Sequence, residues 1–95
     1  MTDLDRDLEL QRLRDQIAAA DAEILELVNR RLELVGEIRA HKETHGVAFL
    51  DPDQERRVLA RLRELNGGPL SADGVDRLFG EILALVKDEL SVTGV

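Results

Sequence analysis

Residues 8–44, LELQRLRDQIAAADAEILELVNRRLELVGEIRAHKET, form the stretch on which the rest of the fold depends. Its apolar residues recur in alternating steps of three and four, which is the period of one face of an α-helix. These residues are Leu10, Leu13, Ile17, Ala20, Ile24, Leu27, Leu34 and Ile38. The stretch has no proline and a single glycine, Gly36. We therefore predict one unbroken helix from about Leu8 to about Thr44.

The predicted helix is too long for one small chain to cover. At 1.5 Å per residue, a helix of about 37 residues is about 55 Å long. A compact chain of 95 residues has a radius of gyration of only about 12–13 Å. The apolar face therefore needs a further partner. A second copy of the chain is favoured because most soluble oligomers are symmetric homo-oligomers, and a partner of different sequence is the alternative.

The composition favours an all-α fold and excludes several functions. Hydrophobic residues make up 43% of the chain and aromatic residues 2%, which is typical of helices packed on helices. Cysteine is absent, so disulfides and thiolate metal sites are excluded and a reducing cytoplasm is compatible. A net charge of −7 argues against nucleic acid and anionic membranes as partners. With no signal peptide or spanning segment expected, we predict a cytoplasmic protein.

Two shorter helices are expected to follow the long one. The sequence DPDQ at 51–54 is a helix start, with Asp51 as the N-cap and Gln54 completing a capping box. The sequence NGGP at 66–69 ends this helix, and Ser71 caps the next. Their predicted apolar faces comprise Val58, Leu59, Leu62 and Leu65 in the second helix and Val75, Leu78, Phe79, Ile82, Leu85, Val86 and Leu90 in the third.

The domain organisation predicted from these elements is simple. We expect residues 1–95 to form a single helical domain, one long helix and two shorter ones, that pairs as an intertwined homodimer. Residues 1–7 are expected to fray because they have no clear apolar period, and residues 91–95 are expected to fray as a C-terminal tail.

Arg31 occupies a position where the apolar register predicts a core residue. A charged group in apolar surroundings must be paired or otherwise satisfied. A side chain that extends to solvent, or an ion pair with Glu33 or Glu37, explains it without a ligand. Lys42 lies eleven residues further on, close to three turns, so both side chains point in nearly the same direction about 16 Å apart along the axis. Together they could hold one small anion.

Arg14 lies about 25 Å from Arg31 along the same helix, so one chain could not readily bring both to one small ligand. In a dimer with antiparallel long helices, Arg14 of one copy would face the region of Arg31 and Lys42 in the other. A solvated surface charge is the simpler explanation of Arg14 or Lys42 taken alone. A cation-lined site shared between two subunits is therefore physically available.

Glu55 and the two histidines are further candidate functional groups. Glu55 lies in the first turn of the second helix, where the helix dipole favours a carboxylate without any function. A hydrogen bond to a ligand hydroxyl explains it equally well. His41 and His45 are four residues apart but have no third ligand nearby in the sequence, so we expect no metal site.

Five segments of the sequence carry a family resemblance, and they occur in a fixed order and spacing. They are LRDQIAAADAEILELVNRRLELV at 13–35, Lys42, DPDQE at 51–55, NGGPL at 66–70 and LFGEI at 78–82. From about Leu13 to Leu85 the chain resembles the all-helical class of chorismate mutases, the type II family. The resemblance implies an intertwined homodimer that rearranges chorismate to prephenate, toward phenylalanine and tyrosine, with no cofactor or metal.

The same resemblance implies a role for each motif residue. Arg31, with Arg14 from the other subunit, would bind the substrate carboxylates, which arginine grips as a fork. Lys42 would donate to the ether oxygen as the C–O bond breaks. Glu55, with the backbone around Asp51, would hold the ring hydroxyl. Catalysis would come from conformational restraint and preorganised charge.

Three positions depart from the family pattern. The family commonly has arginine where this chain has Gln54, serine where it has Val86, and glutamine or glutamate where it has Leu90. We assign all three to the substrate-binding region. Losing one donor in such a site raises the barrier by about 3 kcal/mol, and Arg39 and Arg57 are nearby cations that could partly compensate.

Four functions remain open on the sequence. The first is a chorismate mutase, alone or with a partner enzyme of the shikimate pathway. The second is a relative acting on isochorismate or aminodeoxychorismate, for which the uncharged Gln54 is suited. The third is a weakly catalytic regulatory or interaction domain, favoured by Val86 and Leu90. The fourth is a helical dimerisation module without a ligand.

Overall fold

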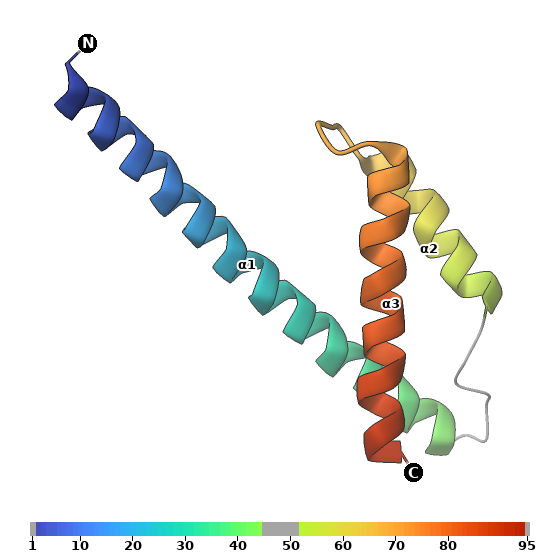
Figure 1. Ribbon diagram of the computed structural model, residues 1–95. Helices are drawn as coiled ribbons and strands as arrows, with labels where there is room; N and C mark the ends of the chain where they lie inside the picture. Colours follow the sequence, from blue (N-terminus) through green and yellow to red (C-terminus); the bar gives the residue numbers. More distant parts are fainter. Residues whose placement is uncertain (1, 45–51, 95) are drawn as a thin grey trace. The chain divides into compact units, whose positions relative to one another are not determined.

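The computed structural model describes residues 2–44 and 52–94, of which 43–44 and 91–94 are described by their backbone alone. The described residues form three α-helices and contain no strand (Figure 1). The helices are α1 (Asp3–Thr44), α2 (Pro52–Leu65) and α3 (Ala72–Gly94). This confirms the predicted all-α class and the order of one long helix and two shorter ones.

The chain divides into two units, Met1–Glu33 and Leu34–Val95. The first contains most of α1, and the second contains the end of α1 with α2 and α3. The single domain over residues 1–95 therefore stays a prediction. Among the described residues, no helix combines the length and the apolar character needed to cross a membrane.

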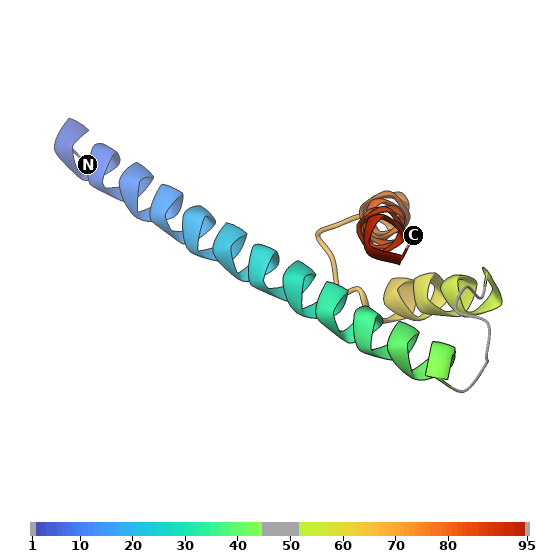
Figure 2. The ribbon, with the colours of Figure 1, turned by 90° about the horizontal axis from the view of Figure 1, so that it is seen from below.

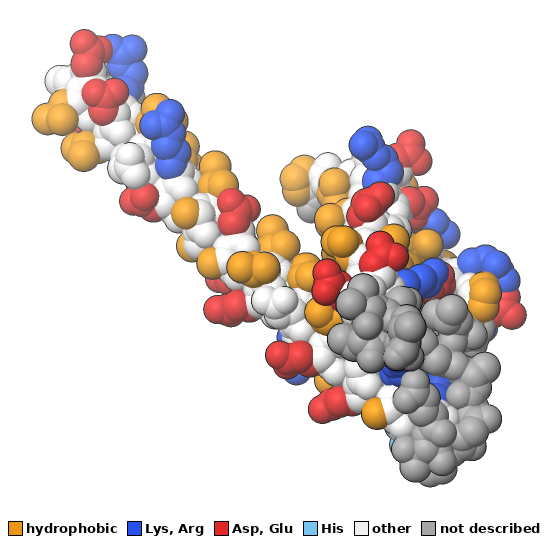
Figure 3. Space-filling model, turned by 60° about the horizontal axis from the view of Figure 1, so that its bottom comes forward, with side chains coloured by type: hydrophobic (Ala, Val, Ile, Leu, Met, Phe, Trp, Pro, Cys, Tyr) orange, Lys and Arg blue, Asp and Glu red, His pale blue; other side chains and the backbone are white. Residues whose placement is uncertain are grey.

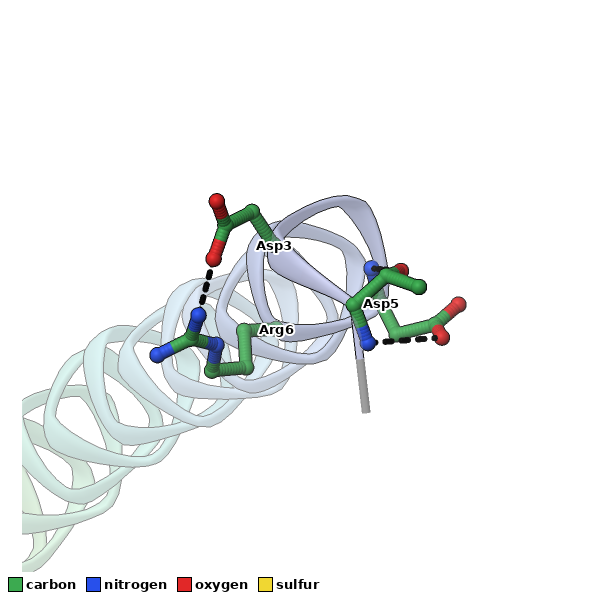
Figure 4. Close-up of polar contacts among 4 residues, drawn as sticks. Asp3, Asp5 and Arg6 are labelled. Atoms are coloured by element: carbon green, nitrogen blue, oxygen red, sulfur yellow. Dashed lines mark hydrogen bonds and ion pairs between the residues drawn. The ribbon is translucent and has the colours of Figure 1, made fainter.

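Helix α1 begins at Asp3, earlier than the predicted start near Leu8, because Thr2 caps it. The Thr2 hydroxyl accepts a hydrogen bond from the Asp5 N–H at 3.1 Å, and the Thr2 N–H donates to the Asp5 carboxylate at 3.3 Å. This reciprocal pair is a capping box, and an ion pair between Asp3 and Arg6 follows it (Figure 4). The first turn is therefore helical, where we expected fraying.

The N-terminal unit presents apolar side chains to solvent. Hydrophobic groups lie among charged ones along the surface of this part of α1 (Figure 3). The exposed fractions of the large hydrophobic residues lie between 42% and 67%. These residues are Leu4, Leu8, Leu10, Leu13, Ile17, Ile24, Leu25 and Leu27. Apolar surface on this scale is typical of a face that another polypeptide covers.

Helices α2 and α3 form an antiparallel hairpin in the second unit (Figures 1 and 2). Asn66 organises the connecting loop, since its amide nitrogen donates to the Leu70 carbonyl at 2.6 Å. Its side-chain oxygen accepts from the Gly68 N–H at 3.0 Å. Gly68 has a φ of 78°, a left-handed conformation that favours glycine. The predicted turn at 66–69 is therefore confirmed.

The apolar contact within this unit is small. Among the described residues, only Val75 and Val86 are buried, with exposed fractions of 3% and 5%. The half-buried residues around them include Val58, Leu59, Leu62, Phe79, Ile82 and Leu90. The prediction was wrong for Leu65, Leu78 and Leu85, which are exposed, because each helix covers only one strip of the other. Helix α3 also extends to Gly94, into the segment expected to fray.

Ser71 caps α3 as predicted, and its hydroxyl accepts a hydrogen bond from the Gly74 N–H at 2.9 Å. We expect Ser71→Ala to lower the free energy of unfolding by about 1 kcal/mol, because that N–H loses its partner. Urea denaturation followed by circular dichroism measures this change. Ser71→Gly is the matched control and should cost only a few tenths of a kcal/mol. Equal midpoints for wild type and Ser71→Ala would contradict the role of this cap.

Candidate functional site

All three predicted anion-binding cations lie on α1. The side chain of Arg14 is exposed, whereas those of Arg31 and Lys42 are half-buried. Within the described part of the chain, none of the three takes part in a hydrogen bond or ion pair through its side chain. Arg14 and Arg31 belong to one unit and Lys42 to the other, so their convergence on one ligand stays a prediction.

Glu55 lies in the first turn of α2, as predicted, and it has a partner that the sequence did not suggest. The Lys87 ammonium, on α3, lies 2.8 Å from one oxygen of the Glu55 carboxylate and 3.0 Å from the other. Lys87 follows the buried Val86 by one residue. Helical periodicity places Lys87 beside the apolar face but gives no sign of which residue it meets.

Gln54 contacts Arg57, one turn further along α2. The Nε and Nη2 groups of Arg57 donate to the Gln54 side-chain oxygen at 3.1 and 3.0 Å. A guanidinium therefore lies beside the position where the family commonly has arginine. Asp51 is outside the described residues, so its predicted roles as N-cap and as part of the hydroxyl-binding backbone stay predictions.

The two departures on α3 lie in different surroundings. Val86 is 5% exposed and belongs to the small core of the second unit. Leu90 is half-buried, and its backbone carbonyl accepts a hydrogen bond from the Arg39 guanidinium on α1. A Cβ built at Gly36 would lie 3.8 Å from the Leu90 side chain, an ordinary van der Waals distance, so this part of α1 lies close to Leu90. A cation thus lies beside the second departure as well.

The described residues contain no group of three or more His, Cys, Asp or Glu side chains that could hold a metal ion. His45, one of the two histidines considered from the sequence, lies outside those residues.

A model of the chorismate mutase type II family matches residues 13–89. The chain belongs to the chorismate mutase type II family. The matched range includes every motif on which the resemblance was based. It also includes all the predicted site residues except Leu90, which is the next residue after the match ends.

Two of the proteins similar to this chain are named for different mutase activities. A bifunctional chorismate mutase/prephenate dehydratase of Neisseria gonorrhoeae is 41% identical over 71 residues, 75% of this chain and 19% of that protein. The chain thus spans about a fifth of the length of this relative. A 4-amino-4-deoxychorismate mutase of Streptomyces venezuelae is 43% identical over 53 residues, 56% of this chain and 52% of that protein.

A solved structure supports the fold. The chorismate mutase (Form I) of Thermus thermophilus superposes with a TM-score of 0.80 at 33% sequence identity. The superposition covers 82% of this chain and 98% of that one. The fold of the chain is therefore that of a solved chorismate mutase.

Proposed function

We propose that the protein is a chorismate mutase, an isomerase that converts chorismate to prephenate in phenylalanine and tyrosine biosynthesis. The observation that carries the proposal is the family match over residues 13–89, a range that contains Arg31, Lys42 and Glu55. These groups supply two cations and one carboxylate. Such a set suits a substrate with two carboxylates, an ether oxygen and a ring hydroxyl.

The proposed reaction is an intramolecular rearrangement in which the ether C–O bond breaks as a C–C bond forms, and no atom leaves the molecule. Arg31 and the partner's Arg14 bind the carboxylates and hold the substrate in its compact reactive shape. Lys42 donates a hydrogen bond to the ether oxygen, where negative charge grows in the transition state. Glu55 accepts a hydrogen bond from the ring hydroxyl. No proton is transferred and no cofactor or metal is needed.

The proposal includes a homodimer with two shared active sites. The exposed apolar residues of α1 and the two-residue buried core among the described residues both favour burial against a second copy. Shared sites bring Arg14 of one subunit to Arg31 of the other, which one chain does not readily do. The cytoplasmic location and a partner enzyme of the same pathway stay predictions.

The departures from the family pattern are compatible with activity in this proposal. Arg57 donates to Gln54, and Arg39 donates to the carbonyl of Leu90. Each of these two positions, where the family has a charged or polar side chain, therefore has an arginine beside it. We infer that these two arginines partly compensate for the polar or charged side chains that are absent at Gln54 and Leu90. Val86 lies in the small apolar core of the second unit, where the missing hydroxyl is not replaced in this way.

The assay that tests the function is direct. Purified protein should consume chorismate and form prephenate, followed by ultraviolet absorbance, at the same rate with and without a metal chelator. Heat-treated protein is the control for spontaneous rearrangement. Absence of consumption at micromolar protein, alone and with a candidate partner synthase, would exclude the chorismate mutase function and leave a related substrate, a regulatory domain or a dimerisation module.

A related substrate is the second candidate. The uncharged Gln54 suits a substrate that carries an amine, and the Streptomyces venezuelae relative is named as a 4-amino-4-deoxychorismate mutase. The ratio of kcat/KM values on chorismate and on 4-amino-4-deoxychorismate separates the two functions. A higher value on the amino substrate would assign the protein to this branch, and isochorismate can be tested in the same way.

A further inference from the structure

The ion pair between Glu55 and Lys87 lies at the proposed site and links two helices. One ammonium contacts both carboxylate oxygens, at 2.8 and 3.0 Å. The two side chains, of Lys87 and Glu55, are 42% and 30% exposed. A glutamate has three rotatable side-chain bonds, and a partner on a neighbouring helix restricts them. The contact therefore fixes where the Glu55 carboxylate lies on α2.

We propose that Lys87 is a positioning residue, which holds the Glu55 carboxylate where it accepts the substrate hydroxyl. This inference rests on the proposed chorismate mutase function. An ionised carboxylate has about four lone-pair sites, so it can accept from Lys87 and from a hydroxyl at the same time. Lys87 does not touch the substrate in this role, and it acts through Glu55 alone.

A second ion pair provides an internal comparison. Arg63 on α2 and Asp76 on α3 are 2.7 Å apart, and both side chains are 42% exposed. This pair also joins α2 to α3, but it lies near the loop and involves no proposed site residue. Partly exposed pairs of this kind add little to stability. If Lys87 served only to join the helices, its removal and that of Arg63 would have the same consequences.

The test compares Lys87→Met with Arg63→Met in the full chain, using steady-state kinetics on chorismate. We expect Lys87→Met to raise KM about tenfold, the cost of a weakened hydrogen bond to a charged group, with a smaller change in kcat. The ring hydroxyl is bound equally in the ground and transition states, so KM carries the effect. Arg63→Met should leave both constants within about twofold. Lys87→Arg should restore most of the affinity.

A double variant connects the effect to Glu55. In the Glu55→Gln background, Lys87→Met should change KM no further, because the carboxylate that it positions is gone. Additive effects would overturn the proposal, and so would equal kinetics for Lys87→Met and Arg63→Met. A lower kcat with unchanged KM and a lower unfolding midpoint would show a structural role instead. Absence of turnover by the wild type would overturn the proposed function and the role of Lys87 with it.

Discussion

Lys42→Ala is expected to lower kcat on chorismate by about a hundred- to a thousandfold, which is the usual effect of removing one preorganised donor from a developing oxyanion. KM should change much less, because the ether oxygen gains charge only as the C–O bond breaks. Single-turnover kinetics at saturating chorismate measures this step without a contribution from product release. The half-buried position of Lys42 supports a strong interaction, since a shielded charge is less screened than an exposed one.

Arg31→Ala provides a second measure of the same site and should raise KM as well as lower kcat, because a carboxylate is bound both before and during the reaction. Arg30→Ala is the matched control, since Arg30 is the neighbouring residue on α1, is exposed and has no proposed role. Circular dichroism should give the same helical content for all three variants. A wild-type rate in either Lys42→Ala or Arg31→Ala would show that the site is placed wrongly.

The fold was predictable from sequence to the extent that local signals determine it. The three- and four-residue steps identified α1, and Ser71 and the NGGP loop at 66–69 identified the start of α3 and the turn before it. The start of α1 was missed because the cap lies in a charged segment without apolar period. It depends on one reciprocal contact between Thr2 and Asp5. Such a contact is short-range but has no periodic signature.

Burial was predicted less well than helicity. Leu78 and Leu85 share the broad apolar face of α3, yet both are exposed beside the buried Val75 and Val86. Periodicity shows which side of a helix is apolar, but it does not show how wide a strip the neighbouring helix covers. In the proposed dimer, part of this remaining surface is available for contacts between subunits.

In the candidate site, too, local features could be predicted from the sequence, whereas contacts between helices could not. Arg31 was predicted as a site residue because a charge in an apolar register needs a partner, and this signal is present in the sequence itself. Lys87 was not found, because its contact with Glu55 joins residues 32 positions apart and depends on how α2 and α3 pack. The arginines beside Gln54 and Leu90 differ in the same respect, since one is a local neighbour and the other comes from another helix. Arg57 is one turn away on the same helix, whereas Arg39 reaches α3 from α1.

Mixing two inactive variants is expected to restore activity if the active sites are shared between subunits. Arg14→Ala and Arg31→Ala should each be nearly inactive alone. After joint unfolding and refolding at equal concentration, half of the dimers contain one chain of each kind. In these dimers one site carries both substitutions and the other carries none. The mixture should therefore recover about a quarter of the wild-type activity.

The control mixture uses Arg31→Ala with Lys42→Ala, two residues assigned to the same subunit's half of the site. Every site in their mixed dimers carries one substitution, so no recovery is expected. Recovery in both mixtures would mean that Arg31 and Lys42 come from different subunits. Absence of recovery with Arg14→Ala, in a protein shown by light scattering to be dimeric, would place Arg14 and Arg31 at the same subunit's site. A monomer of 10.6 kDa would instead exclude shared sites, because no second subunit would be present to contribute Arg14.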